Sequence, residues 1–223
     1  MIKAVAFDIG ETLIDETRIW SRWADRLGVT RLTFLGLLGA MAAADRPISG
    51  AFEIVAPGFD VDAELAAWAA EDPDGLRENF DAADLYPDVR DCLAALRAAG
   101  LRVVIAGNQP PQAGPALERM DLGADLIATS AGWGVSKPEP EFFARTVEAC
   151  GCASEEVLYV GDRLDNDVLP ATAAGLGAVL LRRGPWGYLH ATRPAATRAT
   201  AILDDLTALP ALARDQQIGG RIL

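Results

Sequence analysis

The sequence predicts an α/β protein: a doubly wound parallel sheet with a helical domain inserted near its start. Three observations predict this fold. Short apolar runs alternate with segments of helical periodicity along most of the chain. Polar residues follow several of these runs directly, as they do at the carboxyl ends of parallel strands. One long stretch, residues 16–84, is helical in pattern throughout and interrupts the alternation.

The composition bounds the protein's class and its partners. The chain has 223 residues, 51% hydrophobic and 23% charged, which suits one core-forming domain with a smaller insert. Its net charge of −12 argues against nucleic acid or an anionic membrane as a partner, because both require a basic surface. The amino end enters an apolar strand without a signal-peptide pattern, and the three cysteines cannot all pair. We therefore expect reduced thiols, a cytoplasmic location, and a monomer or homodimer.

The α/β domain is assigned to residues 1–15 and 85–223. Its predicted strands are residues 4–7, 101–106, 126–128, 157–160, 178–181 and 201–203. Its predicted helices are residues 87–99, 112–120, 141–150, 167–174 and 204–213. Residues 184–199 contain Gly and Pro and are predicted to be a surface loop, in which His190 is a surface or structural residue. Because strands and helices alternate, the sheet is expected to be parallel and covered on both faces.

The inserted helical domain, residues 16–84, has four predicted helices. They cover residues 17–27, 33–44, 61–70 and about 76–83, with Pro and Gly marking loops between residues 47 and 58. Arg18, Arg22 and Arg26 lie along one side of the first helix. This basic stripe has two interpretations: a solvated polar face, or a surface that meets an anionic substrate.

Polar residues gather where the predicted strands end. Asp8 follows the first strand, Asn108 the second, and Asp162 and Asp167 the fourth. The carboxyl ends of parallel strands share one edge of the sheet, where open α/β proteins build their sites. For Asp8 alone, a capping or turn-forming role competes with a functional one. The convergence of all four residues favours an enzyme.

Four motifs occur in a fixed order, each after a strand or at a helix start. They are Phe7-Asp8-Ile9-Gly10-Glu11-Thr12-Leu13, Ala106-Gly107-Asn108, Ser136-Lys137-Pro138-Glu139-Pro140-Glu141-Phe142-Phe143 and Gly161-Asp162-Arg163-Leu164-Asp165-Asn166-Asp167. Each motif alone is weak, but together they resemble the haloacid dehalogenase-like hydrolase superfamily across nearly the whole chain. The resemblance implies a Rossmann-like core, and it identifies the helical insert as similar to the family's C1-type cap.

The resemblance also implies a role for each motif residue. Asp8 would be the nucleophile, and Lys137 would neutralise Asp8 and the transferring phosphoryl group. A Mg²⁺ cofactor would take oxygen ligands, which are Asp8, the carbonyl of Gly10, Asp162 and Asp167. The phosphate-binding residues would be Gly107, Asn108, Glu11 and Lys137. The substrate would be a small phosphorylated metabolite.

Two departures separate this chain from the family's usual phosphatases. Those enzymes usually carry a second Asp two residues after the nucleophile, where this chain has Gly10. That Asp transfers protons, and such help is typically worth about 10²–10⁴-fold in rate. Glu11 is the nearest carboxyl that could replace it. Because Glu11 lies one residue further along the chain, its side chain should point in a different direction. The usual Ser or Thr of the second motif is Gly107 here.

Three functions are compatible with these motifs. The first is a Mg²⁺-dependent phosphatase that forms an aspartyl-phosphate at Asp8 and is weak toward poor leaving groups. The second is a haloacid dehalogenase-type C–X hydrolase, although such relatives usually carry Tyr where this chain has Gly10 and need no metal. The third is a catalytically impaired binding or regulatory protein. Retention of Asp162 and Asp167 favours the first.

Overall fold

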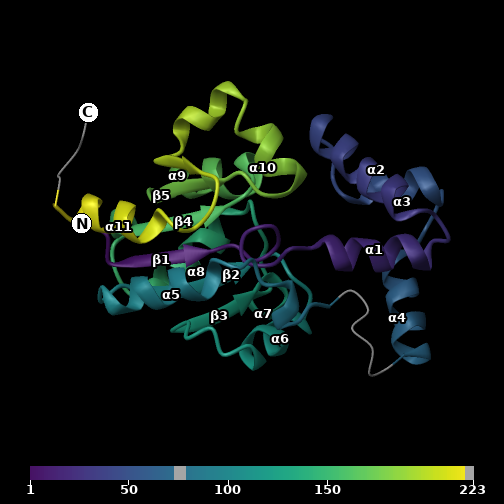
Figure 1. Ribbon diagram of the computed structural model, residues 1–223, viewed down its shortest axis with the longest axis horizontal. Helices are drawn as coiled ribbons and strands as arrows, with labels where there is room; N and C mark the ends of the chain where they lie inside the picture. The colour runs from purple at the N-terminus through teal and green to yellow at the C-terminus, as the bar shows by residue number, and fades with distance from the viewer. Residues whose placement is uncertain (73–78, 219–223) are drawn as a thin grey trace. The chain divides into compact units, whose positions relative to one another are not determined.

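The computed structural model describes residues 1–72 and 79–218, and the chain divides into two compact units (Figure 1). One unit comprises Met1–Asp15 and Leu85–Leu223, and the other comprises Glu16–Asp84. The chain therefore leaves the first unit after its first strand and re-enters it 69 residues later, counting residues 16 to 84 inclusive. At this crossing point Ile14 pairs with Leu85 in an antiparallel bridge, and the Tyr86 N–H donates to the Leu13 carbonyl.

The larger unit is built on a six-stranded parallel sheet in the order β3-β2-β1-β4-β5-β6. The strands are β1 (Ala4–Phe7), β2 (Arg102–Gly107), β3 (Leu126–Thr129), β4 (Val157–Gly161), β5 (Gly177–Leu181) and β6 (Ala201–Leu203). Phe7 at the end of β1 pairs with Ile105 of β2 on one side and Val160 of β4 on the other. The strand order reverses between β1 and β4, which is the place where open α/β sheets bind ligands.

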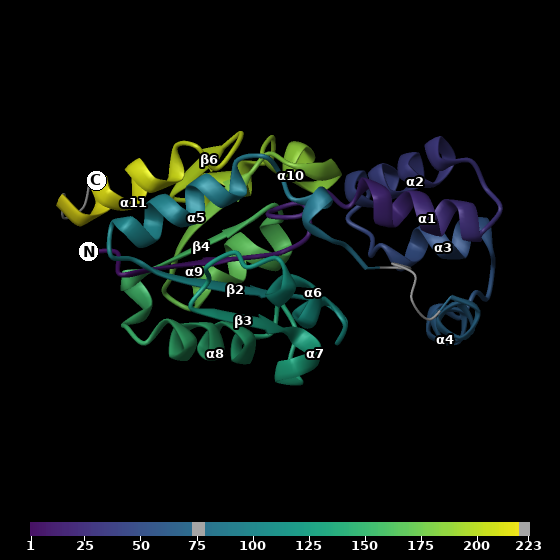
Figure 2. The same cartoon turned by 60° about the horizontal axis from the view of Figure 1, so that its bottom comes forward.

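Helices cover both faces of this sheet, so the predicted doubly wound α/β fold is confirmed. They are α5 (Val89–Ala98), α6 (Ala113–Arg119), α7 (Ser130–Trp133), α8 (Pro140–Cys150), α9 (Leu169–Ala173), α10 (Gly184–His190) and α11 (Leu209–Ile218). Figure 2 shows α5 and α11 on one face and α8 on the other. The inner strand β1 is buried along its whole length, which explains its unbroken apolar sequence.

The segment 184–199 is not a surface loop, so that prediction was wrong. It forms α10 and a 3₁₀ turn at Pro194–Arg198. Trp186, Gly187, His190 and Ala196 are buried in it. Pro185 lies in the first helical turn, where its missing N–H costs nothing, so the residues that suggested a loop instead start a helix.

Two further helix boundaries differ from the prediction. The helix predicted over residues 204–213 begins only at Leu209, because Asp205 accepts the Thr207 N–H in a turn first. The helix predicted over residues 167–174 is preceded by a π-helical turn, Leu164–Val168, and continues as α9. Asp167 is buried in this turn, and the Asp167 backbone N–H donates to the Arg163 carbonyl at 3.1 Å.

The smaller unit is helical and has an aromatic core. Its helices are α1 (Thr17–Arg26), α2 (Arg31–Ala43), α3 (Ser49–Val55), α4 (Val61–Glu71) and the 3₁₀ turn Ala82–Asp84. Trp23 packs edge-on against Phe52 and Trp68, with ring centroids 5.1 and 5.3 Å apart. Helix α3 lies where loops were predicted, since Gly50 is buried under Met41 rather than placed in a turn. The helix predicted over residues 76–83 lies partly outside the described residues.

The arginine stripe of α1 forms ion pairs within the helical unit. Arg26 contacts Glu64 and Glu71, and Arg18 contacts Asp81 and Asp84. Two of the three arginines are therefore occupied by carboxylates of the same unit. Within residues 1–72 and 79–218, no single helix is long and apolar enough to cross a membrane. Only α1 and α2 together reach that length, and they are bent by 116°.

Candidate active site

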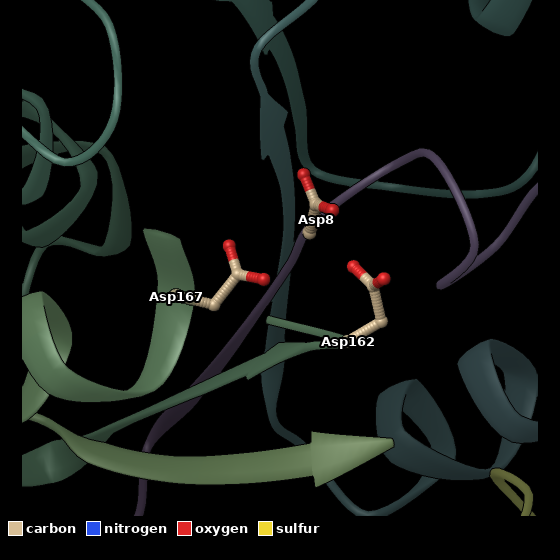
Figure 3. Close-up of side chains that lie close together, drawn as sticks. All are labelled: Asp8, Asp162 and Asp167. Atoms are coloured by element: carbon tan, nitrogen blue, oxygen red, sulfur yellow. The ribbon is translucent and has the colours of Figure 1, made fainter. Parts of the chain in front are cut away.

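Three aspartates meet at the carboxyl edge of the sheet (Figure 3). Asp8 follows β1, Asp162 follows β4, and Asp167 lies in the π-helical turn behind it. One carboxylate oxygen from each lies within 4.8 Å of the others, and Figure 3 shows the three side chains pointing toward one another. The Asp8 N–H donates to the Val160 carbonyl at 2.9 Å, which holds the Asp8 backbone at the end of β1.

Lys137 reaches the same cluster from the loop before α8. Its Nζ donates to Asp8 Oδ1 at 2.5 Å and to Asp167 Oδ1 at 2.6 Å. Lys137 is only 4% exposed, and Asp8, Asp162 and Asp167 are 8%, 3% and 0% exposed. A single ammonium group is thus buried among three carboxyl groups, a charge imbalance that favours an additional cation.

Buried charge shifts the pKa values of this cluster. Burial, with the neighbouring carboxylates of Asp167 and Asp8, raises the pKa of Asp162 well above its ordinary value. Burial also raises the pKa of Asp167 to about 6, although Lys137 acts in the opposite direction. For Lys137, burial lowers the pKa, but Asp167 and Asp8 outweigh it and hold the pKa well above its ordinary value.

Two residues outside the predicted set help to hold Asp167 and Lys137. The Arg163 N–H donates to Asp167 Oδ2 at 2.9 Å. Tyr159 places its ring 5.6 Å from Lys137 Nζ and donates its hydroxyl to the Ala106 carbonyl. One signal in the sequence could have indicated Tyr159, because it is a polar aromatic residue within an apolar run.

Gly161 is required by the position of Asp167. A Cβ atom at Gly161 would lie 2.3 Å from the Asp167 Cγ and Oδ2. No side chain fits at this position unless Asp167 moves. The glycine of the fourth motif therefore permits the close approach of the aspartate to the end of β4.

Gly107 leaves room for the Asp8 side chain. A Cβ at Gly107 would lie 2.6 Å from Asp8 Oδ1 and 3.1 Å from the Ile9 side chain. The space next to the missing Ser or Thr side chain is therefore taken by the nucleophile candidate and its neighbour. Gly107 offers only backbone groups here.

Asn108 holds the Lys137 segment through both ends of its side-chain amide. Its Nδ2 donates to the Lys137 carbonyl at 2.9 Å, and its Oδ1 accepts the Lys137 N–H at 2.8 Å. The two hydrogen bonds fix the backbone that carries the ammonium group. The structure thus places Asn108 beside the second and third motifs, with its amide oxygen directed to Lys137 rather than into the carboxylate cluster.

Glu11 and Gly10 lie in the tight loop after Asp8. Gly10 forms a parallel bridge with Ile14, and the Glu11 N–H donates to the Ile14 carbonyl at 2.8 Å. The Glu11 carboxylate accepts a hydrogen bond from the Tyr86 hydroxyl at 2.6 Å. The structure therefore joins this side chain to Tyr86, whereas Asp8, Lys137, Asp162 and Asp167 form the central cluster.

The donor set fits a hard divalent cation. Three buried carboxyl groups within 4.8 Å supply only oxygen ligands, which Mg²⁺ prefers. Burial, with the neighbouring carboxylates, raises the pKa values of Asp162 and Asp167, and a bound cation would offset this cost of ionisation. Asp8, Asp162 and Asp167 are the side chains that would hold the ion.

A parallel sheet with this cluster at its switch point has the organisation of an α/β enzyme. The family model of the haloacid dehalogenase-like hydrolases matches residues 2–175, so the chain belongs to that family of hydrolases. It is 30% identical over 220 residues to the phosphoglycolate phosphatase of Pseudomonas putida, covering 93% of this chain and 78% of that protein. It is 27% identical over 202 residues to the glyceraldehyde 3-phosphate phosphatase of Methanopyrus kandleri, covering 83% and 86%.

Solved structures show the same fold. A haloacid dehalogenase-like hydrolase from Bacteroides fragilis superposes with a TM-score of 0.68 at 22% identity, covering 94% of this chain and all of that one. The L-2-haloacid dehalogenase of Xanthobacter autotrophicus superposes with a TM-score of 0.62 at 21% identity, covering 96% and 99%. Both similarities extend over nearly the full length of the chain.

Proposed function

We propose that this protein is a Mg²⁺-dependent phosphatase of small phosphorylated metabolites that works through an aspartyl-phosphate at Asp8. One observation carries the proposal: the buried contact of Lys137 with Asp8 and Asp167, beside Asp162. Phosphatase relatives that cover most of the chain support it. We also propose that the helical unit, Glu16–Asp84, is a C1-type cap.

The residues would divide the chemistry as follows. An Asp8 carboxylate oxygen attacks phosphorus, the bond from phosphorus to the leaving oxygen breaks, and the departing oxygen takes a proton from water. Lys137 stabilises the negative charge of the transferring group. Water then attacks the phosphorus of phospho-Asp8, releasing inorganic phosphate and the carboxylate. Asp8, Asp162 and Asp167 would hold Mg²⁺. The ion would supply Lewis-acid stabilisation of the negative charge on the phosphoryl group.

Gly10 determines which substrates turn over quickly. It supplies no proton to the leaving oxygen and no base for the second step. Good leaving groups need little protonation, so acyl phosphates and nitrophenyl phosphate should react faster than sugar phosphates. Phospho-Asp8 should also accumulate, because its hydrolysis lacks a positioned base.

The first prediction tests the nucleophile. Asp8→Asn should reduce the turnover of acetyl phosphate and nitrophenyl phosphate to background, because an amide cannot form the acyl phosphate. Rapid-quench experiments with the wild-type protein and ³²P-labelled acetyl phosphate should trap an acid-stable, hydroxylamine-sensitive phosphoprotein that Asp8→Asn lacks. A panel that includes 2-phosphoglycolate and glyceraldehyde 3-phosphate then defines the substrate.

Two results would argue against the proposal. Turnover of chloroacetate in the presence of EDTA would indicate the dehalogenase chemistry of a C–X hydrolase. Unchanged ligand binding by Asp8→Asn, with no turnover of any phosphate ester by the wild type, would indicate a binding protein that has lost its activity. Asp91→Asn, which changes an exposed carboxylate of α5, serves as the matched control.

A further inference from the structure

The loop between Asp8 and Ile14 carries a backbone conformation that its sequence does not favour. Glu11 has φ +49°, in the left-handed region that L-residues with side chains rarely adopt. The loop is closed by hydrogen bonds within it: the Glu11 N–H donates to the Ile14 carbonyl, and the Leu13 N–H donates to the Ile9 carbonyl. A strained residue persists only where its surroundings hold it.

The Glu11 side chain is fixed between two segments that are distant in the sequence. Its carboxylate accepts the Tyr86 hydroxyl at 2.6 Å, across a separation of 75 residues. Gly184 also lies against this side chain, since a Cβ there would come within 2.6 Å of Glu11 Cγ and 2.9 Å of Glu11 Cδ. Gly184 itself has φ +57°, so the chain uses a glycine where the Glu11 side chain passes.

Arg183 completes the same structure. Its guanidinium lies 4.1 Å from the centre of the Tyr86 ring, and its Nη1 donates to the Thr12 carbonyl at 2.7 Å. Its Nη2 pairs with Asp88 at the start of α5. The loop after Asp8 is therefore held at two adjacent residues, at Glu11 by its side chain and at Thr12 by its carbonyl.

We propose that Glu11 is a positioning residue for the phosphatase reaction proposed above: its hydrogen bond with Tyr86 holds the Asp8–Ile14 loop so that Asp8 is correctly placed. This inference rests on the proposed function. It separates two roles that a carboxylate beside Gly10 can have. A proton-transferring Glu11 needs an ionisable group, whereas a positioning Glu11 needs only an oxygen that accepts the Tyr86 O–H.

Conservative substitutions distinguish these roles. Glu11→Gln keeps an oxygen acceptor, so it should retain turnover within about threefold of wild type with an unchanged pH profile. Glu11→Ala and Tyr86→Phe each remove the hydrogen bond and should lower kcat by about 10- to 100-fold, because a small displacement of the nucleophile is costly. The double variant should be no slower than either single variant, since both remove the same interaction.

A glycine variant removes the ambiguity of misfolding. Glu11→Gly deletes the side chain but relieves the left-handed backbone, whereas Glu11→Ala deletes it and retains the strain. Glu11→Gly should therefore have a higher Tm than Glu11→Ala and an equally low kcat. A loss of activity that followed Tm instead would indicate a purely structural role and overturn the inference.

Hydrogen exchange tests the loop without relying on turnover. Peptides that cover residues 8–14 should exchange faster in Glu11→Ala and Tyr86→Phe than in wild type, and at the wild-type rate in Glu11→Gln. Equal exchange in all four proteins would overturn the inference. It would also be overturned if Glu11→Gln lowered kcat by about 100-fold or more and removed one limb of the pH profile. An inactive wild type with faster exchange in the two variants would instead reject the phosphatase and keep the loop contact.

Discussion

At the scale of single residues, the site depends on how one lysine is placed. Lys137 is buried, and its ammonium contacts both Asp8 and Asp167. Its backbone is held on both sides by the Asn108 amide, and the Tyr159 ring lies beneath its charge. An arginine would not fit this arrangement, because its planar fork needs a different set of acceptors. The two glycines at 107 and 161 then allow the carboxylates to approach.

The second prediction concerns Gly10. Gly10→Asp adds a carboxyl at the position where the family's usual phosphatases carry their second Asp. It should raise the turnover of sugar and alkyl phosphates, by up to about 10²-fold, and shorten the lifetime of phospho-Asp8. Steady-state kinetics and rapid-quench trapping measure the two effects.

Gly10→Asn is the matched control for this experiment, because it has the same size and transfers no proton. An equal gain in both variants would show that loop packing, not proton transfer, limits the wild type. No gain in either variant would mean that the missing carboxyl is not what limits turnover.

The residue-level chemistry was partly readable from the sequence. Asp8 and Asp162 directly follow apolar runs, so their convergence followed from the parallel sheet. The inward position of Asp167 depends on the π-helical turn, which was not predicted. The contacts of Asn108 and Glu11 did not follow from the sheet. The direction of a loop side chain depends on its contact partners. For Glu11 the partner is Tyr86, 75 residues away in the sequence, so no local sequence pattern predicts the contact.

At the scale of secondary structure, α10 supports the loop that carries the acidic ligands. His190 is buried and its Nδ1 accepts the Leu164 N–H at 2.9 Å, inside the π-helical turn. The Arg163 guanidinium lies over the ring of Trp186 in the same helix, with its Cζ 4.8 Å from the ring centre. Helix α10 thus contacts the segment between Asp162 and Asp167.

The third prediction follows from this contact. His190→Ala leaves the buried Leu164 N–H without its acceptor, which should lower the free energy of unfolding by about 1–3 kcal/mol. Chemical denaturation measures the change. Mg²⁺ affinity should fall as well, because the turn bearing Asp167 loses a support.

Tyr188 in the same helix provides the control. It is 66% exposed, so Tyr188→Ala should change the free energy of unfolding by no more than about 0.5 kcal/mol. Equal destabilisation by both variants would show that the effect does not come from the His190 hydrogen bond.

Sequence reasoning missed α10 for a physical reason. Gly184, Pro185 and Gly187 are loop formers by composition, yet each has a specific helical use here. Gly184 has a positive φ at the helix start, and Gly187 lies so close to the Leu181 carbonyl that a Cβ would come within 2.3 Å of it. Close packing against a strand selects glycine as strongly as a turn does.

At the scale of the whole molecule, the buried acids couple stability to pH. Asp162 has a folded-state pKa raised well above its ordinary 3.8, and Asp167 is raised to about 6. Acids with raised pKa values bind protons more tightly in the folded state. Their stabilising contribution is therefore present below about pH 4 and is lost as pH rises through the folded-state pKa values.

The fourth prediction uses this sign. In EDTA, Asp162→Asn should gain Tm relative to wild type as pH rises above about 4, because only the wild type acquires a buried charge at residue 162. Mg²⁺ should raise the wild-type Tm mainly above about pH 6, since the ligands must be deprotonated, and should not raise that of Asp162→Asn. Scanning calorimetry with and without Mg²⁺ measures both trends. A wild-type Tm that is insensitive to Mg²⁺ at all pH values would contradict the cation site.

The overall architecture was the most predictable level. Alternation of apolar runs and helical patterns predicted the parallel sheet, because each buried strand has to be covered on both faces. Helices of the larger unit were missed where packing overrides composition, as in α10, and misplaced where a turn delays a helix, as before α11. The short helix α7 was also not predicted.

The bridge between Ile14 and Leu85 has an evolutionary consequence. Because the chain leaves and re-enters the larger unit at adjacent residues, residues 16–84 form a single insertion at one point of that unit. Replacing that segment by a short turn or by a different insert should leave the strand pairings and the acidic ligands of the larger unit in place, because none of them comes from residues 16–84. A lineage can therefore exchange this helical module as one piece while inheriting the reaction centre intact.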